Sequence, residues 1–270
     1  MRKIYFTIIA LMASLAVSAQ STKEYVDLGL PSGTLWATCN IGANSPEEYG
    51  DYFAWGETEP KEDYYWTTYK WCNGWDTMTK YCVDSEKGVV DNNTELDPED
   101  DAATVNWGSE WCMPTIGQLD ELFFSNYTTV KWTTQNGVYG VKIYSKKNNQ
   151  SLFFPAAGVR IGTRLDSDVI PDEGPGGYYR TRSLVAGGGN WNTSEFAYGI
   201  DFNANVSGYF VDRFFGGSVR PIRLKEKVTT SINSVTAGQK VTKNGKYISG
   251  GNLVIVKDGK KYNANGMEIK

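Results

Sequence analysis

One segment of the chain carries a clear helical pattern of apolar positions. Between residues 116 and 123 the apolar side chains recur at three- and four-residue spacing, which places them on one face of a helix. Thr115 is expected to cap the start of this helix in a capping box with Gln118. The apolar residues of that face are Ile116, Leu119, Leu122 and Phe123.

Elsewhere the pattern is one of short runs bounded by Gly, Pro, Asn or Asp, which predicts strands. Two further helix starts place a proline at the first helical position, at 45–48 and 97–100. A few short helices among many strands predict an α+β domain. The predicted strands are 25–30, 35–41, 140–146, 151–156, 177–183, 196–203, 208–214 and 218–224.

The pattern changes after residue 224. Residues 225–239 are polar and small, which predicts a linker, whereas residues 240–270 place Asn-Gly, Gly-Gly and Asp-Gly turns around short apolar runs. We therefore predict a short β-hairpin tail at 240–270, and so short a module buries little core of its own.

The first residues of the chain predict export. Arg2 and Lys3 precede an apolar run that ends in small residues at Val17 and Ala19, which is typical of a secretory signal peptide. We assign residues 1–19 to that signal. No later run is as long as a membrane span, so we expect a periplasmic, outer-surface or secreted protein without a membrane span.

The chain has four cysteines and no histidine. Export places cysteines in an oxidising environment, where disulfides are expected rather than metal ligands. Four cysteines allow three pairings. Cys72 and Cys82 enclose a short loop and are the favoured pair, and Cys39 with Cys112 follows by elimination. Because no pair has CxxC spacing, no metal site is predicted.

Charge narrows the range of partners. The formal net charge is −4, and the acidic excess lies in residues 21–224, with lysines concentrated after residue 225. An acidic body without a basic, aromatic stripe argues against nucleic acid. The acidic run at 91–101 has the oxygen ligands that calcium prefers, but not the spacing of an EF-hand. We expect a solvated loop there and no cofactor, with calcium as the alternative.

Three phrases together carry a family resemblance: "YVDLGLPSGTLWATCNIGANSPEEYGDYFAWGET" (25–58), "LDPEDDAATVNWGSEWCMPTIGQLDEL" (96–122) and "GGSVRPIR" (216–223). In order and wording they resemble the Fibrobacter succinogenes major paralogous domain, which is abundant in exported proteins of Bacteroidetes. The resemblance implies a C-type lectin-like fold over residues 20–224, with short helices and long loops. Cys112 departs from the phrase, which more often has Arg there. The tail is similar to short tails of exported Bacteroidetes proteins, some of which are sorting signals.

A recognition surface on such a fold needs amphipathic side chains on a stable frame. The region 178–214 supplies aromatic, Arg and Asn side chains, a mixture that suits sugar faces and hydroxyls or a protein epitope. Trp191, in a glycine-rich run, has the strongest expectation of exposure. The predicted ligand-binding residues are Tyr178, Tyr179, Arg180, Arg182, Trp191, Asn192, Tyr209 and Arg213.

The residues give little support to catalysis. Without histidine there is no Ser-His or Cys-His pair, and no nucleophile elbow or phosphate-binding glycine loop is present. Paired carboxylates could still hydrolyse glycosides, with Glu57 or Glu59 beside Trp55 as candidates. We therefore predict an exported, non-catalytic recognition or adhesion module for a glycan or protein. The alternatives are a carbohydrate-active enzyme and a purely structural surface protein.

Overall fold

The computed structural model divides the chain into two compact units, Met1–Arg223 and Leu224–Lys270. The predicted signal peptide, Trp191 and Asn192 lie outside the residues that the structure describes. The described residues are 23–74, 77–166, 175–186, 194–203, 206–225, 233–234, 245–249, 252–258, 260–263 and 267–269.

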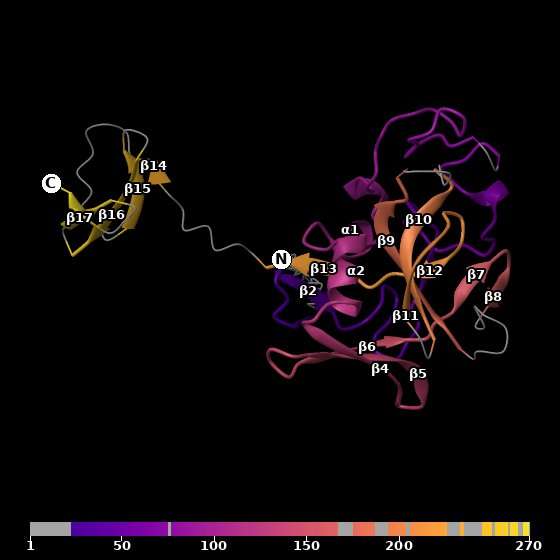
Figure 1. Ribbon diagram of the computed structural model, residues 1–270. Coiled ribbons are helices and arrows are strands. Elements are labelled where there is room, and N and C mark those ends of the chain that lie inside the picture. Colours follow the sequence, from indigo (N-terminus) through magenta and orange to yellow (C-terminus); the bar gives the residue numbers. More distant parts are fainter. Residues whose placement is uncertain are drawn as a thin grey trace, which may run out of the picture. The chain divides into compact units, whose positions relative to one another are not determined.

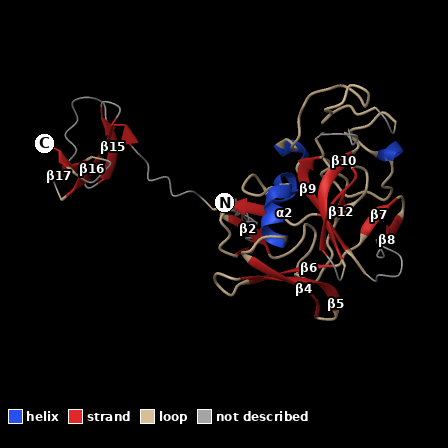
Figure 2. Ribbon diagram, viewed as in Figure 1, coloured by secondary structure: helices blue, strands red, loops and turns tan. Residues whose placement is uncertain are grey.

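Strands dominate the first unit (Figures 1 and 2). One sheet has the order β1 (Tyr25–Asp27), β2 (Thr34–Ala37), β13 (Ile222–Leu224). A second has the order β11 (Val206–Asp212), β10 (Phe196–Phe202), β9 (Gly177–Leu184), β12 (Gly217–Ser218), β3 (Tyr52–Phe53). A third has the order β4 (Thr128–Gln135), β5 (Val138–Ser145), β6 (Ser151–Pro155), and β7 (Val159–Ile161) pairs with β8 (Arg164–Asp166).

Helical structure is limited. Helix α2 (Ile116–Phe123) forms where it was predicted, and its capping box is confirmed: the Thr115 hydroxyl accepts from the Gln118 amide, and the Gln118 side chain accepts from the Thr115 amide at 2.9 Å. The helix packs against β4, β9 and β10 (Figure 1). The other helical elements are α1 (Ala102–Trp107) and the 3₁₀ turns η1 (Trp66–Thr68) and η2 (Pro98–Asp100).

The predicted α+β, C-type lectin-like architecture of residues 20–224 is wrong. Among the described residues α1 and α2 are the only α-helices, so the fold is largely β. The proline-led segment at 45–48 forms a turn closed by the Glu48 amide on the Ser45 carbonyl at 3.2 Å, and not a helix. The pattern also missed β4, in which Thr129, Lys131 and Thr133 alternate with Val130 and Trp132.

Aromatic side chains connect α2 to the sheets in the largest core. Phe123 of α2 lies 5.4 Å from Phe154 of β6 and 6.0 Å from Phe202 of β10, between ring centroids. Phe154 in turn contacts Tyr179 of β9 at 4.9 Å and Trp36 of β2 at 6.0 Å. Because each ring comes from a different element, this core holds three sheets and the helix together.

The second unit carries the hairpins that the turn dipeptides predict. Its antiparallel pairs bury Val254 and Val256, which alternate along one strand. Its strands, in sheet order, are β14 (Asn233–Ser234), β15 (Gly245–Ser249), β16 (Asn252–Lys257), β17 (Lys260–Tyr262) and β18 (Glu268–Ile269).

The predicted disulfide between Cys72 and Cys82 is wrong, because Cys82 is a free thiol whose Sγ donates to the Asp84 carbonyl at 3.0 Å. The backbone of Cys72 bridges instead to Met78, and the amide of Cys82 donates to Asp91 at 3.0 Å. The backbone of each of the two cysteines thus has its own partner outside the predicted pair.

The predicted Cys39–Cys112 disulfide is also wrong, since both are free thiols. Cys112 pairs by backbone with Ile222 of β13. Ala37, two residues before Cys39, bonds the opposite edge of the same segment through the carbonyl of Pro221, which directly precedes β13. The two cysteines are thus separated by β13, about 10 Å or two strand spacings. A disulfide needs α-carbons within about 7 Å.

Thiol labelling checks whether these cysteines are free. With reductant absent, peptide mapping should find Cys39, Cys82 and Cys112 alkylated after unfolding. In the folded protein Cys112 should react slowly, because burial raises the pKa of its thiol to about 11 and leaves little thiolate at neutral pH. Recovery of a Cys39–Cys112 cross-linked peptide would contradict the structure.

Candidate functional site

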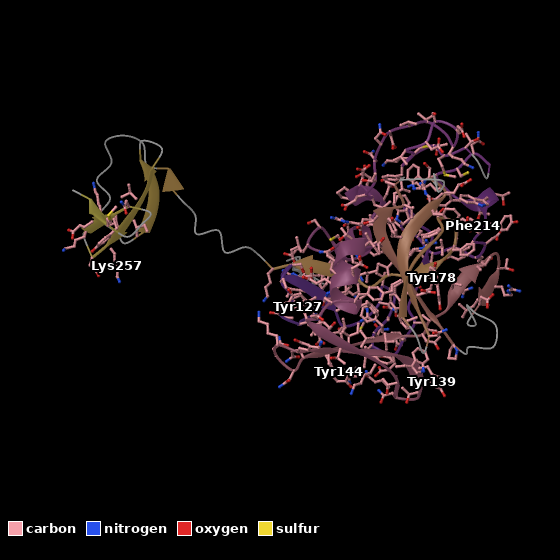
Figure 3. The ribbon with its side chains drawn as sticks, viewed as in Figure 1. Tyr127, Tyr139, Tyr144, Tyr178, Phe214 and Lys257 are labelled. Atoms are coloured by element: carbon pink, nitrogen blue, oxygen red, sulfur yellow. The ribbon has the colours of Figure 1, made fainter. Side chains whose placement is uncertain are left out.

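Four of the predicted ligand-binding residues lie inside the first unit. Tyr178, Tyr179, Arg180 and Arg213 are each at most 1% exposed. Tyr178 is a residue of β9, and Figure 3 labels it near the middle of the first unit in that view. In this structure these side chains belong to the frame of the fold and do not form a ligand-binding surface.

Arg213 shows why a charged residue occupies the interior. Its guanidinium donates to the Tyr69 hydroxyl at 2.8 Å and to three backbone carbonyls, and it lies 4.7 Å from the centre of the Trp55 ring. Those carbonyls belong to Tyr81, Ser194 and Lys80, at 3.1, 2.9 and 3.0 Å. One side chain thereby donates hydrogen bonds to carbonyls of loop residues that are not paired in a sheet.

Arg180 and Tyr179 face opposite sides of β9. The Arg180 guanidinium donates to the carbonyls of Asp212, at 2.8 Å, and Phe215, and burial lowers its pKa below the ordinary value. The Tyr179 hydroxyl donates to the Pro155 carbonyl at 3.0 Å and accepts from Asn40 at 3.2 Å. Both residues connect strands to loops.

Arg182 is the one predicted site residue with a described, partly exposed side chain. Its guanidinium forms an ion pair with Glu95 at 3.1 Å. Tyr209 lies on β11, but its side chain falls outside the described part of the structure. Of the predicted ligand-binding residues whose side chains the structure describes, Arg182 alone reaches the surface.

The first unit has a polar pocket elsewhere. It holds about 420 Å³ and lies between β3, the segment 60–64 and the β7–β8 hairpin. The hairpin is joined to the segment by two backbone hydrogen bonds between Tyr64 and Gly162, at 2.9 and 2.8 Å. Gly50 at its edge has φ +72°, and a Cβ there would lie 2.2 Å from the Ile41 carbonyl, so this turn requires glycine.

Two buried tyrosines line the pocket. The Tyr64 hydroxyl donates to the Tyr52 carbonyl at 2.6 Å, and the Tyr52 hydroxyl donates to the Ala157 carbonyl. Burial raises the pKa of both hydroxyls, so both stay protonated and act as donors. The Tyr64 ring packs flat on Gly216, where a Cβ would lie 2.6 Å from the ring. With their hydroxyls used inside the fold, these tyrosines give the pocket a rigid aromatic wall.

Arg160 brings positive charge to this wall. Two backbone hydrogen bonds with Gly216, at 2.8 and 2.9 Å, fix its main chain, and its guanidinium lies 5.1 Å from the centre of the Tyr52 ring. Within the described residues the guanidinium forms no hydrogen bond or ion pair. Its five N–H donors are therefore open to a ligand in the pocket.

Acceptors lie around the same pocket. Asp51, Glu62 and Thr163 line it, and their side chains form no hydrogen bond or ion pair with any described residue. Lys61 is different, because its ammonium group donates to Glu57 and to the Thr68 carbonyl, each at 2.9 Å. The open groups are thus one guanidinium, two carboxylates and one hydroxyl.

The acidic run at 91–101 is used within the fold. Asp91 accepts from the amides of Tyr81 and Cys82, at 2.7 and 3.0 Å. Burial acts to raise the pKa of Asp100, but hydrogen bonds from Lys80, Tyr81 and Lys70 outweigh it and hold that pKa below its ordinary value. Among the described residues no group of three His, Cys, Asp or Glu side chains could hold a metal ion.

None of the predicted site residues lines the pocket, which was not predicted from the sequence. Its residues come from positions 50–64 and 160–163, which lie far apart in the chain. A signal was present in the aromatic run Tyr64-Tyr65-Trp66, which follows the charged residues 61–63. The partner hairpin carries no comparable signal, because β7 and β8 have three residues each.

Comparison with protein-family models, with curated proteins and with solved structures gives no match for this chain. In the part of the chain that the structure describes, no helix combines the length and apolar character needed to cross a bilayer.

Proposed function

We propose that this chain is an exported, non-catalytic recognition module that binds a glycan in the pocket beside Arg160. The observation that carries the proposal is the open guanidinium of Arg160, held against the Tyr52 ring in a pocket of about 420 Å³. Export rests on the predicted signal peptide, and glycan binding agrees with the ligand class expected from the sequence.

The chemistry of the pocket fits a neutral, polyhydroxylated ligand. Sugar hydroxyls both donate and accept hydrogen bonds, and the pocket offers donors from Arg160 and acceptors from Asp51 and Glu62. The nearby carboxylates disfavour an anionic ligand at this site. A preformed wall also lowers the entropy lost on binding.

The enzymatic alternative has less support. Hydrolysis by paired carboxylates needs one carboxyl group that can donate a proton to the leaving oxygen. Glu57, one of the predicted candidates, is buried and accepts hydrogen bonds from the Lys61 ammonium and the Lys70 amide at 2.9 and 2.8 Å. These contacts engage the Glu57 carboxylate within the fold and favour a structural role.

A glycan panel tests the proposal. The full chain should bind at least one neutral oligosaccharide, and Arg160→Met should weaken that binding by about 10- to 100-fold, because hydrogen bonds to a charged group contribute about 1.5–3 kcal/mol. Isothermal titration or surface plasmon resonance measures the change. Turnover of the bound sugar would contradict the non-catalytic assignment.

The matched control is Arg164→Met, on the next strand of the same hairpin. Arg164 is exposed, forms an ion pair with Asp166 at 3.2 Å and does not line the pocket. The Arg164→Met substitution removes the same charge from the same hairpin but leaves the pocket lining intact. Glycan affinity should therefore stay within about twofold of the unmodified chain. Equal losses in the two variants would show that net charge, and not the pocket, governs binding.

A further inference from the structure

One long segment of the first unit contains no acidic residue. The whole chain carries a formal net charge of −4, yet no Asp or Glu occurs between Glu121 and Asp166. This segment forms β4, β5, β6, β7 and most of β8. Its basic residues are Lys131, Lys142, Lys146, Lys147, Arg160 and Arg164.

The strand register places two of these lysines on one face. Lys131 of β4 lies directly opposite Lys142 of β5. Val141 and Ile143, the neighbours of Lys142, are buried in the core, so alternation directs Lys142 and Tyr144 to the outer face. The Lys131 ammonium lies 5.7 Å from the centre of the Tyr144 ring. We call Lys131, Lys142 and Tyr144 the lysine face.

The turn after β5 adds two more cations. Lys146 and Lys147 are exposed, and the Lys146 amide donates to the Tyr127 carbonyl at 2.9 Å, which places this turn beside an exposed tyrosine. Figure 3 shows Tyr127 and Tyr144 along the periphery of the β4–β5 sheet. Cations and aromatic rings therefore follow one side of the first unit.

The positive charge of this face is poorly compensated within the fold. Like charges directly opposite each other on a sheet are destabilising. Lys142 donates to the Gln135 amide oxygen at 3.2 Å, and Gln135 donates to the Glu47 carboxylate at 2.7 Å. Glu47 is therefore linked to Lys142 only through the Gln135 side chain. None of the four lysines forms an ion pair with a described residue.

We propose that the lysine face binds an anionic polysaccharide. Carboxylate or sulfate groups repeated along a sugar chain would pair with the opposed lysines, and the Tyr144 ring, 38% exposed, would contact a sugar ring. The lysine face offers no aliphatic side chain for insertion into a bilayer, and the acidic remainder of the unit would repel a nucleic acid duplex. This site is separate from the pocket and does not depend on it.

Binding of the full chain to polygalacturonate tests the proposal, with neutral dextran, phosphatidylglycerol vesicles and duplex DNA as comparison probes. Polygalacturonate should bind and dextran should not. Binding should fall steeply between about 0.1 M and about 1 M salt, over which the Debye length shrinks from about 10 Å to about 3 Å. Preference for vesicles or DNA over polygalacturonate would overturn the assignment.

Paired substitutions locate the surface. Lys131→Gln with Lys142→Gln should weaken polygalacturonate binding by about three- to tenfold, and Lys131→Arg with Lys142→Arg should retain it. The control is Lys257→Gln with Lys261→Gln, which removes two exposed charges from the second unit. If the control pair weakens binding as much as the first pair, or if the first pair has no effect, the lysine face is not the site.

Discussion

An Arg213→Met variant should lose about 3–5 kcal/mol of folding free energy in the first unit. Methionine keeps much of the side-chain volume but donates no hydrogen bond. The carbonyls of Tyr81, Ser194 and Lys80 would lose their donor. The Tyr69 hydroxyl would lose the bond that it accepts but would still donate to the Trp55 carbonyl. Each buried polar group left unsatisfied costs about 1–3 kcal/mol, partly offset because the guanidinium no longer has to be desolvated.

Thermal unfolding followed by near-ultraviolet circular dichroism measures the effect. For a domain of this size a loss of 3–5 kcal/mol lowers Tm by about 6–20 °C. Arg164→Met serves again as the control, because its exposed side chain should change stability by less than about 0.5 kcal/mol. Equal Tm values for the two variants would show that the buried contacts of Arg213 contribute nothing net.

Asp101→Ala should be the second large loss, about 2–4 kcal/mol. The Asp101 carboxylate, 1% exposed, caps α1 by accepting from the amides of Ala103 and Thr104, each at 2.9 Å. It also accepts from the Met113 amide at 2.9 Å. Alanine would therefore remove a helix cap and leave a buried amide unpaired on the segment that leads into α2.

Denaturant unfolding measures the loss of folding free energy in Asp101→Ala, with Glu99→Ala as the comparison variant. Glu99 is exposed in the turn just before α1, and its side chain has no hydrogen bond or ion pair with a described residue. That variant should stay within about 0.5 kcal/mol of the unmodified chain. A loss for Asp101→Ala no larger than that for Glu99→Ala would show that the cap is dispensable.

Local signals in the sequence were sufficient to predict individual helices and strands. The capping box of Thr115 and Gln118 involves residues three apart, so the pattern alone predicts where α2 begins. The strands at 151–156 and 177–183 were predicted for the same reason, because their boundaries are set by neighbouring turn residues. Fold class was not predictable in this way, since it depends on how short elements pair across the chain.

Two physical reasons explain why neither the burial of the predicted arginines nor the pocket was predicted from the sequence. Arginine is usually exposed, and nothing near Arg180 or Arg213 in sequence shows that distant loops supply carbonyl acceptors for a buried guanidinium. The pocket, in turn, depends on two backbone hydrogen bonds between Tyr64 and Gly162. Contacts between residues so far apart leave no periodic signal in a single sequence.

The sheet order β1–β2–β13 also bears on how the chain folds. The Ala37 amide bonds the Pro221 carbonyl, so β2 obtains its second neighbour only from the last strand of the first unit. During synthesis that edge of β2 stays unpaired until nearly the whole unit has been made. Contacts of such high sequence separation slow folding and leave intermediates open to aggregation. We therefore expect slow refolding, with the joining of β13 to β2 among its last steps.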